Sequence, residues 1–299
     1  MEAGEELNQP VHKGLKKGLY LIPSAFTAAN IGMGFLAVLA SLHGFQLVYQ
    51  NADQAAVYFD YAAKAIAFAI LFDTLDGRVA RMTKTATEIG VQLDSLADIL
   101  TFGIAPIVLA YGWSIGANFG EDNSLHGFGI FVLFMYLMCG TFRLARFNLQ
   151  AIRPRVLAAG TPKVDKKNFV GLPIPPAAGL LAAIVHFTPR PLNFYGAGWS
   201  DFYTILMMIL IAGLGLLMVS TIRYTSFKTV GSNRRSIYLI LIIAAVGMLA
   251  WLYSRYVFLI IAIAYVSHGL IFYLLNSLRS TKRETETAET NNQLTEETD

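Results

Sequence analysis

Long apolar runs separated by short polar connections make up most of the chain. A helix needs about 20 predominantly apolar residues to cross a bilayer, and eight runs approach or exceed that length. The pattern therefore predicts an all-α fold, a polytopic integral membrane helical bundle of about eight transmembrane helices. The expected spans lie at about 21–42, 55–81, 88–115, 128–147, 169–188, 202–222, 236–253 and 256–275.

Changes of polarity divide the chain into four predicted parts. Residues 1–19 are polar and then basic, which suits a cytoplasmic, interfacial segment on an anionic leaflet, or a flank that only orients the first span. Residues 20–187 form a core of about five spans, and residues 188–278 add about three more. Residues 279–299 are rich in acids and almost without apolar side chains, so we expect a disordered cytoplasmic tail.

The composition agrees with a membrane protein. Only 14% of the 299 residues are charged and 55% are hydrophobic, whereas a soluble domain carries roughly a quarter charged residues. The single cysteine, Cys139, excludes an internal disulfide, and the polar, acidic N-terminus does not resemble a cleavable signal peptide. None of the five histidines lies at metal-ligand spacing from another, so we interpret them as interfacial or packing residues. The sequence displays neither a Ser-His-Asp arrangement, nor a Gly-rich phosphate loop, nor a nucleic-acid module.

Lysine and arginine residues gather in alternate connections between the expected spans. They cluster before the first span and after the second, fourth, sixth and eighth, while the other connections hold only Arg190 and Arg255. Because basic residues are enriched in cytoplasmic loops, we expect both termini in the cytoplasm. The turn that follows the second span is expected on the same side.

Four aspartates lie on either side of this turn. Asp73 and Asp76 are spaced i,i+3 and Asp94 and Asp98 i,i+4, so each pair lies on one face of its helix. Two consecutive antiparallel helices would bring the four carboxylates to a common place. Charged side chains within membrane spans are costly and mark a functional site by default. Carboxylates this close repel one another unless divalent cations neutralise them, and hard oxygen ligands suit Mg²⁺ or Mn²⁺.

Further fixed positions surround the aspartates. The stretch has the pattern D-x2-D-G-x2-A-R-x8-G-x3-D-x3-D, with eight fixed positions over 26 residues. It resembles, at every position, the motif of the CDP-alcohol phosphatidyltransferases, which are integral membrane enzymes of phospholipid synthesis. The resemblance implies that the protein is a homodimer. The fixed positions are Asp73, Asp76, Gly77, Ala80, Arg81, Gly90, Asp94 and Asp98.

Transfer of a phosphatidyl group is a substitution at phosphorus that depends on positioning and on stabilisation of charge. Two cations a few ångströms apart suit this task, because they bridge phosphate oxygens. Asp73, Asp76 and Asp94 are the expected ligands, and Asp98 is expected to bind the second ion. The resemblance implies that Asp98 also accepts the proton of the attacking hydroxyl.

Residues that follow the first aspartate pair are candidates for binding the nucleotide and the diphosphate. Gly77 and Ala80 leave one helix face almost without side chains, where a cytosine ring or ribose can approach, although small residues also serve helix packing. Arg81 suits a bidentate contact with the diphosphate or a snorkelling role at the helix end. The family pattern puts a nucleotide contact near Thr87, a position that equally suits a helix cap.

The first expected span adds Thr27 and Asn30, which share a helix face. They resemble the P-N-x-x-T segment with which relatives reach the diphosphate. Here Ser24 stands in place of the usual asparagine after Pro23, which departs from the family pattern.

Two later segments bear on the acceptor alcohol. The fourth span ends in Arg-Leu-Ala-Arg-Phe-Asn (143–148), and the fifth opens with Phe-Val-Gly-Leu-Pro-Ile-Pro-Pro-Ala-Ala (169–178). Both look like segments of the family members that use serine. Arg143 and Arg146 are expected to hold the serine carboxylate and Asn148 to add a polar contact. The alternative is that the arginines only anchor the helix end and fix its orientation.

The resemblance covers about residues 20–185 and implies transfer of a phosphatidyl group from CDP-diacylglycerol to L-serine, giving phosphatidylserine and CMP. The motif contains no covalent nucleophile, so direct attack by serine is expected. The nearest alternative keeps the chemistry and uses glycerol phosphate or inositol phosphate as acceptor. A cation transporter is a remote alternative, because it leaves Gly77, Ala80 and Arg81 without a role. We expect a multi-pass protein of the inner (cytoplasmic) membrane with its active site at the cytoplasmic side.

Overall fold

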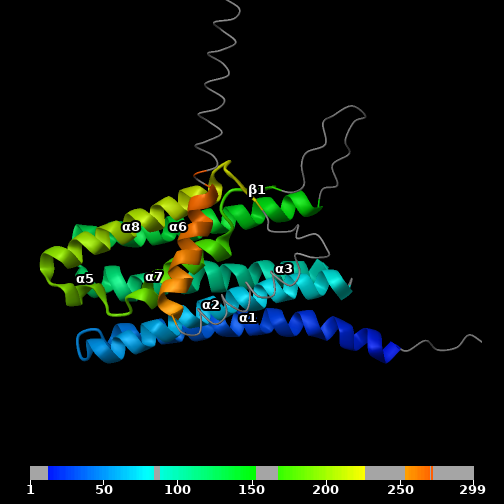
Figure 1. Cartoon of the computed structure of the whole chain (residues 1–299), viewed down its shortest axis with the longest axis horizontal. Coiled ribbons are helices and arrows are strands. Elements are labelled where there is room, and N and C mark those ends of the chain that lie inside the picture. Colours follow the sequence, from blue (N-terminus) through cyan, green and yellow to red (C-terminus); the bar gives the residue numbers. More distant parts are fainter. Residues whose placement is uncertain (1–12, 84–87, 153–167, 226–252, 270, 272–299) are drawn as a thin grey trace, which may run out of the picture.

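A computed structural model describes residues 13–83, 88–152, 168–225, 253–269 and 271. The described chain is almost entirely helical, and most of its helices lie side by side in an elongated bundle (Figure 1). The numbered α-helices are α1 (Lys13–Leu47), α2 (Ala52–Thr83), α3 (Glu88–Asp98), α4 (Ala105–Ala110), α5 (Gly116–Asn118), α6 (Ser124–Ile152), α7 (Ile174–Phe187) and α8 (Ala197–Val219).

Five of the described helical stretches are long and apolar enough to cross a membrane. They are Ala25–Leu47, Ala52–Gly77, Ile89–Asn118, Ser124–Leu149 and Gly198–Val219. Helix α7 and a helix over Ser254–Gly269 are apolar but shorter. The prediction of a polytopic helical membrane protein is therefore confirmed. The count of eight spans stays a prediction, because the run at 236–253 lies almost entirely outside the described residues.

Helices α1 and α2 pack as a hairpin (Figure 1). Asn51 begins the second arm, since its Oδ1 accepts a hydrogen bond from the backbone N–H of Gln54 at 3.1 Å. The face of α2 that is buried repeats every three to four residues, as expected for an amphipathic helix. That face consists of Ala55, Phe59, Ala62, Ile66 and Ala69. Its alanines allow close packing, which places the aspartate-bearing end of α2 beside α1.

The third expected span is a helical rod interrupted by two π-helical turns. The first, η1 (Ile99–Ile104), follows α3, and the second, η2 (Tyr111–Ile115), follows α4. Thr101 of η1 lies so close to Gly34 of α1 that a Cβ added to the glycine would be 2.4 Å from Thr101 Oγ1. π-Helical turns are frequent at functional sites, and η1 begins directly after Asp98.

The fifth expected span begins later than predicted. Strand β1 (Asn168–Val170) occupies its expected start and pairs antiparallel with strand β2 (Arg223–Thr225). Gly171 then turns the chain with φ +83°, a backbone conformation that favours glycine. Pro173 is extended, with ψ 145°, so the helix starts only at Ile174. Apart from this short ribbon, the described fold is all-α.

The remaining helices complete the common hydrophobic core. Helix α6 packs against α8, and the hydroxyl of its buried Tyr136 donates a hydrogen bond to the carbonyl of Phe102 at 3.1 Å. The helix over Ser254–Gly269 lies across the bundle in Figure 1, where it is orange. Its residue Val266 is buried in the common core. The C-terminal helix is therefore packed onto the same core as α2 and α7.

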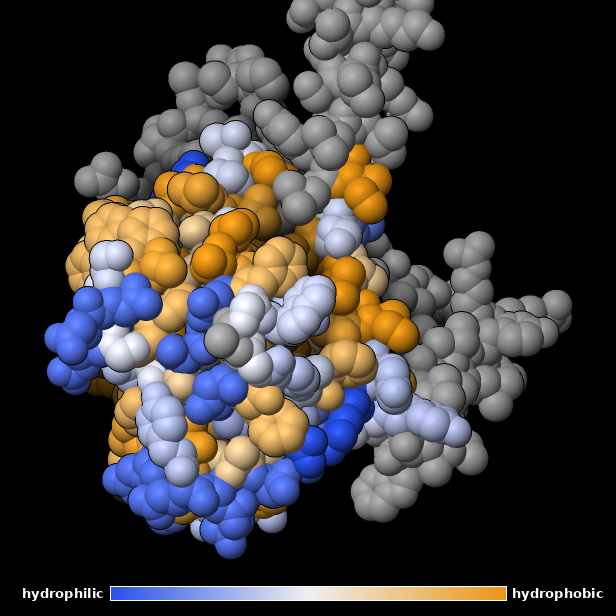
Figure 2. All heavy atoms as spheres, turned by 90° about the vertical axis from the view of Figure 1, so that its left-hand side faces the viewer, coloured by the Kyte–Doolittle hydropathy of each residue, from blue (hydrophilic) through white to orange (hydrophobic). Residues whose placement is uncertain are grey.

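The bundle has two polar ends. The end at the left of Figure 1 carries the α1–α2 turn and α5, and Figure 2 shows hydrophilic side chains among apolar ones there. Arg190 Nη2 lies 2.9 Å from Asp53 Oδ1, and Asn118 Nδ2 donates a hydrogen bond to Asp201 at 2.8 Å. The end of α2 and the beginning of α3 lie at the opposite end (Figure 1). An apolar middle between two polar ends is the arrangement that a bilayer requires.

Candidate functional site

Three of the four motif aspartates converge. Asp73 comes from α2, and Asp94 and Asp98 come from successive turns of α3. One carboxylate oxygen from each of the three lies within 4.8 Å of the others, and all three side chains are partly buried. The Oδ1 atom of Asp98 is buried and has no hydrogen-bond partner within the described part of the chain. A set of hard oxygen donors with an unsatisfied member fits a divalent cation such as Mg²⁺ or Mn²⁺.

The fourth aspartate, Asp76, lies one turn beyond Asp73 but is not one of the three. Its Oδ2 accepts a short hydrogen bond from the hydroxyl of Thr27 in α1, and its side chain is only 6% exposed. It still repels Asp73 and Asp94 electrostatically. The hydrogen bond with Thr27 therefore holds Asp76 at the edge of the aspartate cluster and connects α1 to the site.

Asn30 is the second residue that α1 brings to this region. It is 1% exposed, and neither polar atom of its side-chain amide has a hydrogen-bond partner among the described residues. Its backbone carbonyl accepts a hydrogen bond from Thr101 Oγ1 at 3.2 Å. An unsatisfied buried amide is costly, so this side chain is suited to bind a polar ligand. The side chain of Ser24 lies outside the description.

The three predicted acceptor residues have different environments. Arg143 is partly buried and interacts electrostatically with Asp98, and its Nε atom is buried without a hydrogen-bond partner in the described chain. Arg146 is exposed. The amide of Asn148 donates a hydrogen bond to Ser95 Oγ of α3 at 2.9 Å. The structure thus brings Arg143 to the aspartates, and Asn148 joins the ends of α6 and α3.

The predicted nucleotide contacts lie at the end of α2. Gly77 is exposed there. Ala80 and Arg81 belong to the same helix, but their side chains are outside the described set, and Thr87 lies in the undescribed stretch 84–87. Their roles stay predictions.

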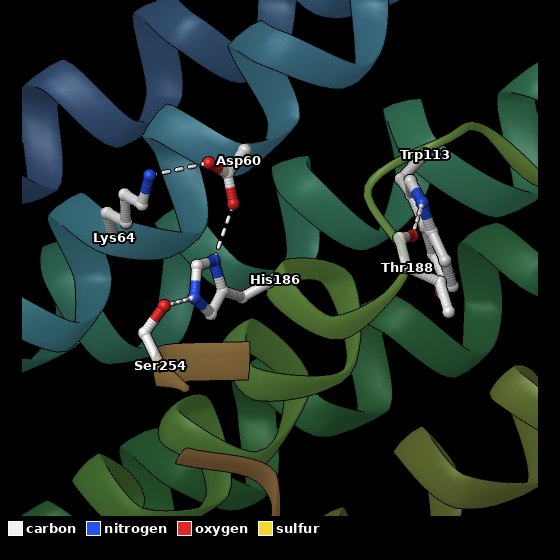
Figure 3. Close-up of polar contacts among 6 residues, drawn as sticks. All are labelled: Asp60, Lys64, Trp113, His186, Thr188 and Ser254. Carbon is white, nitrogen blue, oxygen red and sulfur yellow. Dashed lines mark hydrogen bonds and ion pairs between the residues drawn. The ribbon is translucent and has the colours of Figure 1, made fainter. Parts of the chain in front are cut away.

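Sequence reasoning missed a polar network inside the bundle (Figure 3). His186 Nδ1 lies 2.5 Å from Asp60 Oδ1, and His186 Nε2 lies 3.0 Å from Ser254 Oγ. Lys64 Nζ forms an ion pair with the second oxygen of Asp60 at 2.7 Å. The order Asp-His-Ser is that of a catalytic triad, but His186 is only 4% exposed, so we interpret the network as structural. The signal in the sequence was a charged pair, spaced i,i+4, within an apolar span.

Sequence reasoning also missed Tyr265 of the C-terminal helix. Its phenol group is partly buried and interacts electrostatically with Arg143. Nothing in the local sequence connects a tyrosine in the last apolar run to an arginine at the end of the fourth.

Comparisons with known proteins identify the family of the chain. A family model described as CDP-alcohol phosphatidyltransferase matches residues 20–219. The CDP-diacylglycerol–serine O-phosphatidyltransferase of Helicobacter pylori is 33% identical over 256 residues, which cover 86% of this chain and 92% of that protein. The protein of the same name from Methanocaldococcus jannaschii is 32% identical over 251 residues, covering 83% and 92%. The Bacillus subtilis protein of that name is 31% identical over 207 residues, covering 69% and 91%. The chain therefore belongs to the CDP-alcohol phosphatidyltransferase family.

Proposed function

We propose that this protein is an enzyme that transfers the phosphatidyl group of CDP-diacylglycerol to the hydroxyl of L-serine, giving phosphatidylserine and CMP. The observation that carries the proposal is the convergence of Asp73, Asp94 and Asp98 beside Arg143. Relatives at 31–33% identity are named for this reaction with serine. The aspartates are suited to hold the cations that bind the diphosphate of the lipid substrate. The arginine is suited to bind an acceptor that carries a carboxylate.

The first task of the site is to hold the diphosphate. Two divalent cations, Mg²⁺ or Mn²⁺, bound by Asp73, Asp94 and Asp98 with Asp76 beside them, would neutralise charge on the diphosphate. The Asn30 amide is buried and unsatisfied, so it donates to a diphosphate oxygen. Gly77 leaves room for the nucleotide beside the cluster, and Arg81 and Thr87 complete its contacts.

The second task is to activate and orient serine. Arg143 binds the serine carboxylate through its planar guanidinium, and Arg146 and Asn148 line the same end of α6. Asp98 takes the hydroxyl proton on one of its carboxylate oxygens while the serine oxygen attacks the lipid-bearing phosphorus. The bond between that phosphorus and the bridging oxygen breaks, and CMP leaves. No covalent intermediate with the protein is required.

We propose further that the enzyme is a homodimer of the inner (cytoplasmic) membrane, with both termini and the aspartate cluster on the cytoplasmic side. The support for the orientation is the distribution of lysine and arginine along the sequence, and the homodimer rests on the family resemblance. The catalytic core is residues 20–187, flanked by the interfacial segment 1–19, the helices of 188–278 and the tail 279–299. A cytoplasmic active site gives serine direct access, and CDP-diacylglycerol reaches it from the bilayer.

The identity of the acceptor alcohol can be tested by measuring CMP release with each candidate. Purified protein in mixed micelles with CDP-diacylglycerol is offered L-serine, glycerol 3-phosphate or inositol phosphate separately, with Mg²⁺ and with Mn²⁺. We expect release with serine and at most a few per cent of that rate with either phosphate. Release that depends on one of the phosphates and not on serine would transfer the proposal to that acceptor. Cation flux in liposomes without CMP release would indicate a transporter.

A further inference from the structure

An apolar groove of about 330 Å³ lies between α7 and α8. Among the described residues, those that line it include none assigned to the reaction. Its floor is Trp113 of η2, which is 2% exposed and whose Nε1 donates a hydrogen bond to the carbonyl of Thr188 at 3.0 Å (Figure 3). The wall formed by α8 extends from Tyr203 to Leu210, which is about 10 Å along the helix axis.

The groove opens on an exposed, apolar face of α8. This helix lies in one of the stretches that are long and apolar enough to cross a membrane. Leu206 lines the groove and is 51% exposed, and Phe202 and Ile209, one helical turn away on either side, are also exposed. Side chains on the outside of a membrane span are in contact with lipid tails, which are as apolar as leucine. The groove is therefore continuous with the hydrocarbon of the bilayer.

Aromatic side chains surround the end of the groove that is nearer the membrane surface. Tyr195 and Tyr203 both line the groove, and their ring centroids are 5.8 Å apart. The exposed Trp199 stacks on Tyr203 at 5.9 Å. Tyrosine and tryptophan are enriched where a membrane meets water. Asp201 belongs to the polar end of the bundle that carries α5 and the α1–α2 turn, and Asp73 lies about 30 Å along α2 from that turn. The groove therefore begins at the membrane surface opposite to the aspartate cluster and extends toward the bilayer centre.

We propose that this groove binds one acyl chain of a bilayer phospholipid, in the leaflet opposite to the aspartate cluster. Apolar voids of this size are few in proteins, because empty space loses packing contacts. Water is a poor occupant, since it needs about two to four polar partners and the Trp113 N–H is already bonded to Thr188. The bilayer supplies a long, apolar chain directly at Leu206. A chain bound there fills the space between α7, α8 and η2 and stabilises their packing.

The tryptophan in the floor of the groove allows a direct test. The chain has three tryptophans, so Trp199→Phe combined with Trp251→Phe leaves Trp113 as the only one. The full chain with both changes is reconstituted in phosphatidylcholine vesicles whose acyl chains do or do not carry bromine, which quenches indole emission only at close approach. We expect most of the Trp113 emission to be lost in the brominated vesicles. Equal emission in the two kinds of vesicle would overturn the inference, because no lipid chain would then reach the floor.

Two substitutions on α8 distinguish the groove from the surrounding bilayer. Leu210→Phe adds volume inside the groove and should restore most of the emission. Leu216→Phe is the matched control, because it makes the same change at a position of the same helix that is 60% exposed, and it should leave the quenching unchanged. Quenching that persists in Leu210→Phe would mean that bromine reaches Trp113 by another route. Quenching that disappears at a high ratio of protein to lipid would assign the groove to a second copy of the chain, and either result would overturn the inference.

Thermal unfolding in detergent provides a second measurement. A ligand that binds only the folded protein raises its Tm. Added phosphatidylcholine should therefore raise the Tm of the unsubstituted chain and of Leu216→Phe more than that of Leu210→Phe. An equal rise in the two variants would contradict a chain bound in the groove. Neither measurement uses CMP release, so a negative result here leaves the proposed function unaffected.

Discussion

At the scale of single residues, Asp98 is the group on which the proposed chemistry depends most. It is the one residue expected both to bind a cation and to take a proton, and its Oδ1 is buried without a partner in the described chain. One carboxylate oxygen of Asp73 and one of Asp94 lie within 4.8 Å of a carboxylate oxygen of Asp98. Removing its charge should therefore affect catalysis much more than folding.

We expect Asp98→Asn to lower serine-dependent CMP release by roughly a hundredfold or more, the range for loss of a general base. The amide keeps the shape of the side chain but cannot accept the proton. The matched control is Asp53→Asn, at an exposed aspartate beside the α1–α2 turn, which should retain activity. Rates within a factor of ten of the unsubstituted protein in Asp98→Asn, with equal amounts in the membrane, would refute the role.

A second prediction concerns the arginines. Because Arg143 is partly buried beside Asp98 and Arg146 is exposed, Arg143→Ala should raise the serine KM about tenfold or more, and Arg146→Ala should raise it less. The loss of a charged hydrogen bond sets this magnitude. Initial rates at varied serine and saturating CDP-diacylglycerol measure both. A larger rise of the serine KM in Arg146→Ala than in Arg143→Ala would show that the more buried arginine is not the main contact to the acceptor.

The aspartates could be found from the sequence because their spacing is tied to helix geometry. Their convergence needs only two neighbouring helices, and the structure brings Asp73, Asp94 and Asp98 together. The difference between Arg143 and Arg146 could not be found, since an i,i+3 pair on an isolated helix presents both residues alike. Burial by other elements separates them, and that depends on packing that a local pattern does not contain.

At the scale of elements, the contact between α1 and η1 positions the cluster. Gly34 and Thr101 touch directly, and Thr101 is three residues after Asp98. Adding a methyl group to Gly34 would put it 2.9 Å from the Thr101 Cα atom, so the backbone of η1 would have to move.

We therefore expect Gly34→Ala to destabilise the protein by about 1–3 kcal/mol, as overpacking does, and to reduce CMP release by shifting α3. Gly32→Ala is the matched control on the same helix, because a Cβ there meets nothing within 4 Å. It should be neutral or slightly stabilising, since alanine favours helix more than glycine does. Thermal unfolding in detergent, followed by light scattering, compares the two. Equal stability of both variants would contradict the close packing seen at Thr101.

Apolar runs predicted the long helices well, because a bilayer span is set by length and hydrophobicity. They did not predict the π-helical turns η1 and η2, since an apolar run has nearly the same pattern in either helix type. They also placed the start of α7 too early. Pro173 and the pairing of β1 with β2 decide that boundary, and the partner strand lies more than 50 residues away in the chain.

At the scale of the whole molecule, the bundle separates two polar ends, and the proposed orientation assigns one of them to the cytoplasm. A single cysteine introduced at Asn123, beyond α5, and another at Thr85, after α2, should therefore react with a membrane-impermeant maleimide from opposite sides. Both belong in a Cys139→Ala background, because Cys139 is the one native cysteine. Labelling of intact cells and of inverted vesicles distinguishes the sides. Reaction of both positions from the same side would contradict the orientation.

The packing of the Ser254–Gly269 helix is a property of the whole molecule that the sequence did not reveal. Its run predicted a last transmembrane span, and only the structure shows that Ser254 contacts His186. This contact joins residues 68 positions apart, and a periodic pattern along the sequence does not indicate contacts between residues so far apart.

The most direct test of the account is the metal dependence of serine-driven CMP release from CDP-diacylglycerol by the purified full chain. We predict that release stops when EDTA is added, returns when Mg²⁺ or Mn²⁺ is restored in excess, and is absent in Asp94→Ala under all three conditions. Release that continues in EDTA, or that Asp94→Ala sustains with metal present, would contradict the claim that the aspartates of α2 and α3 hold the ions at which the lipid diphosphate is cleaved.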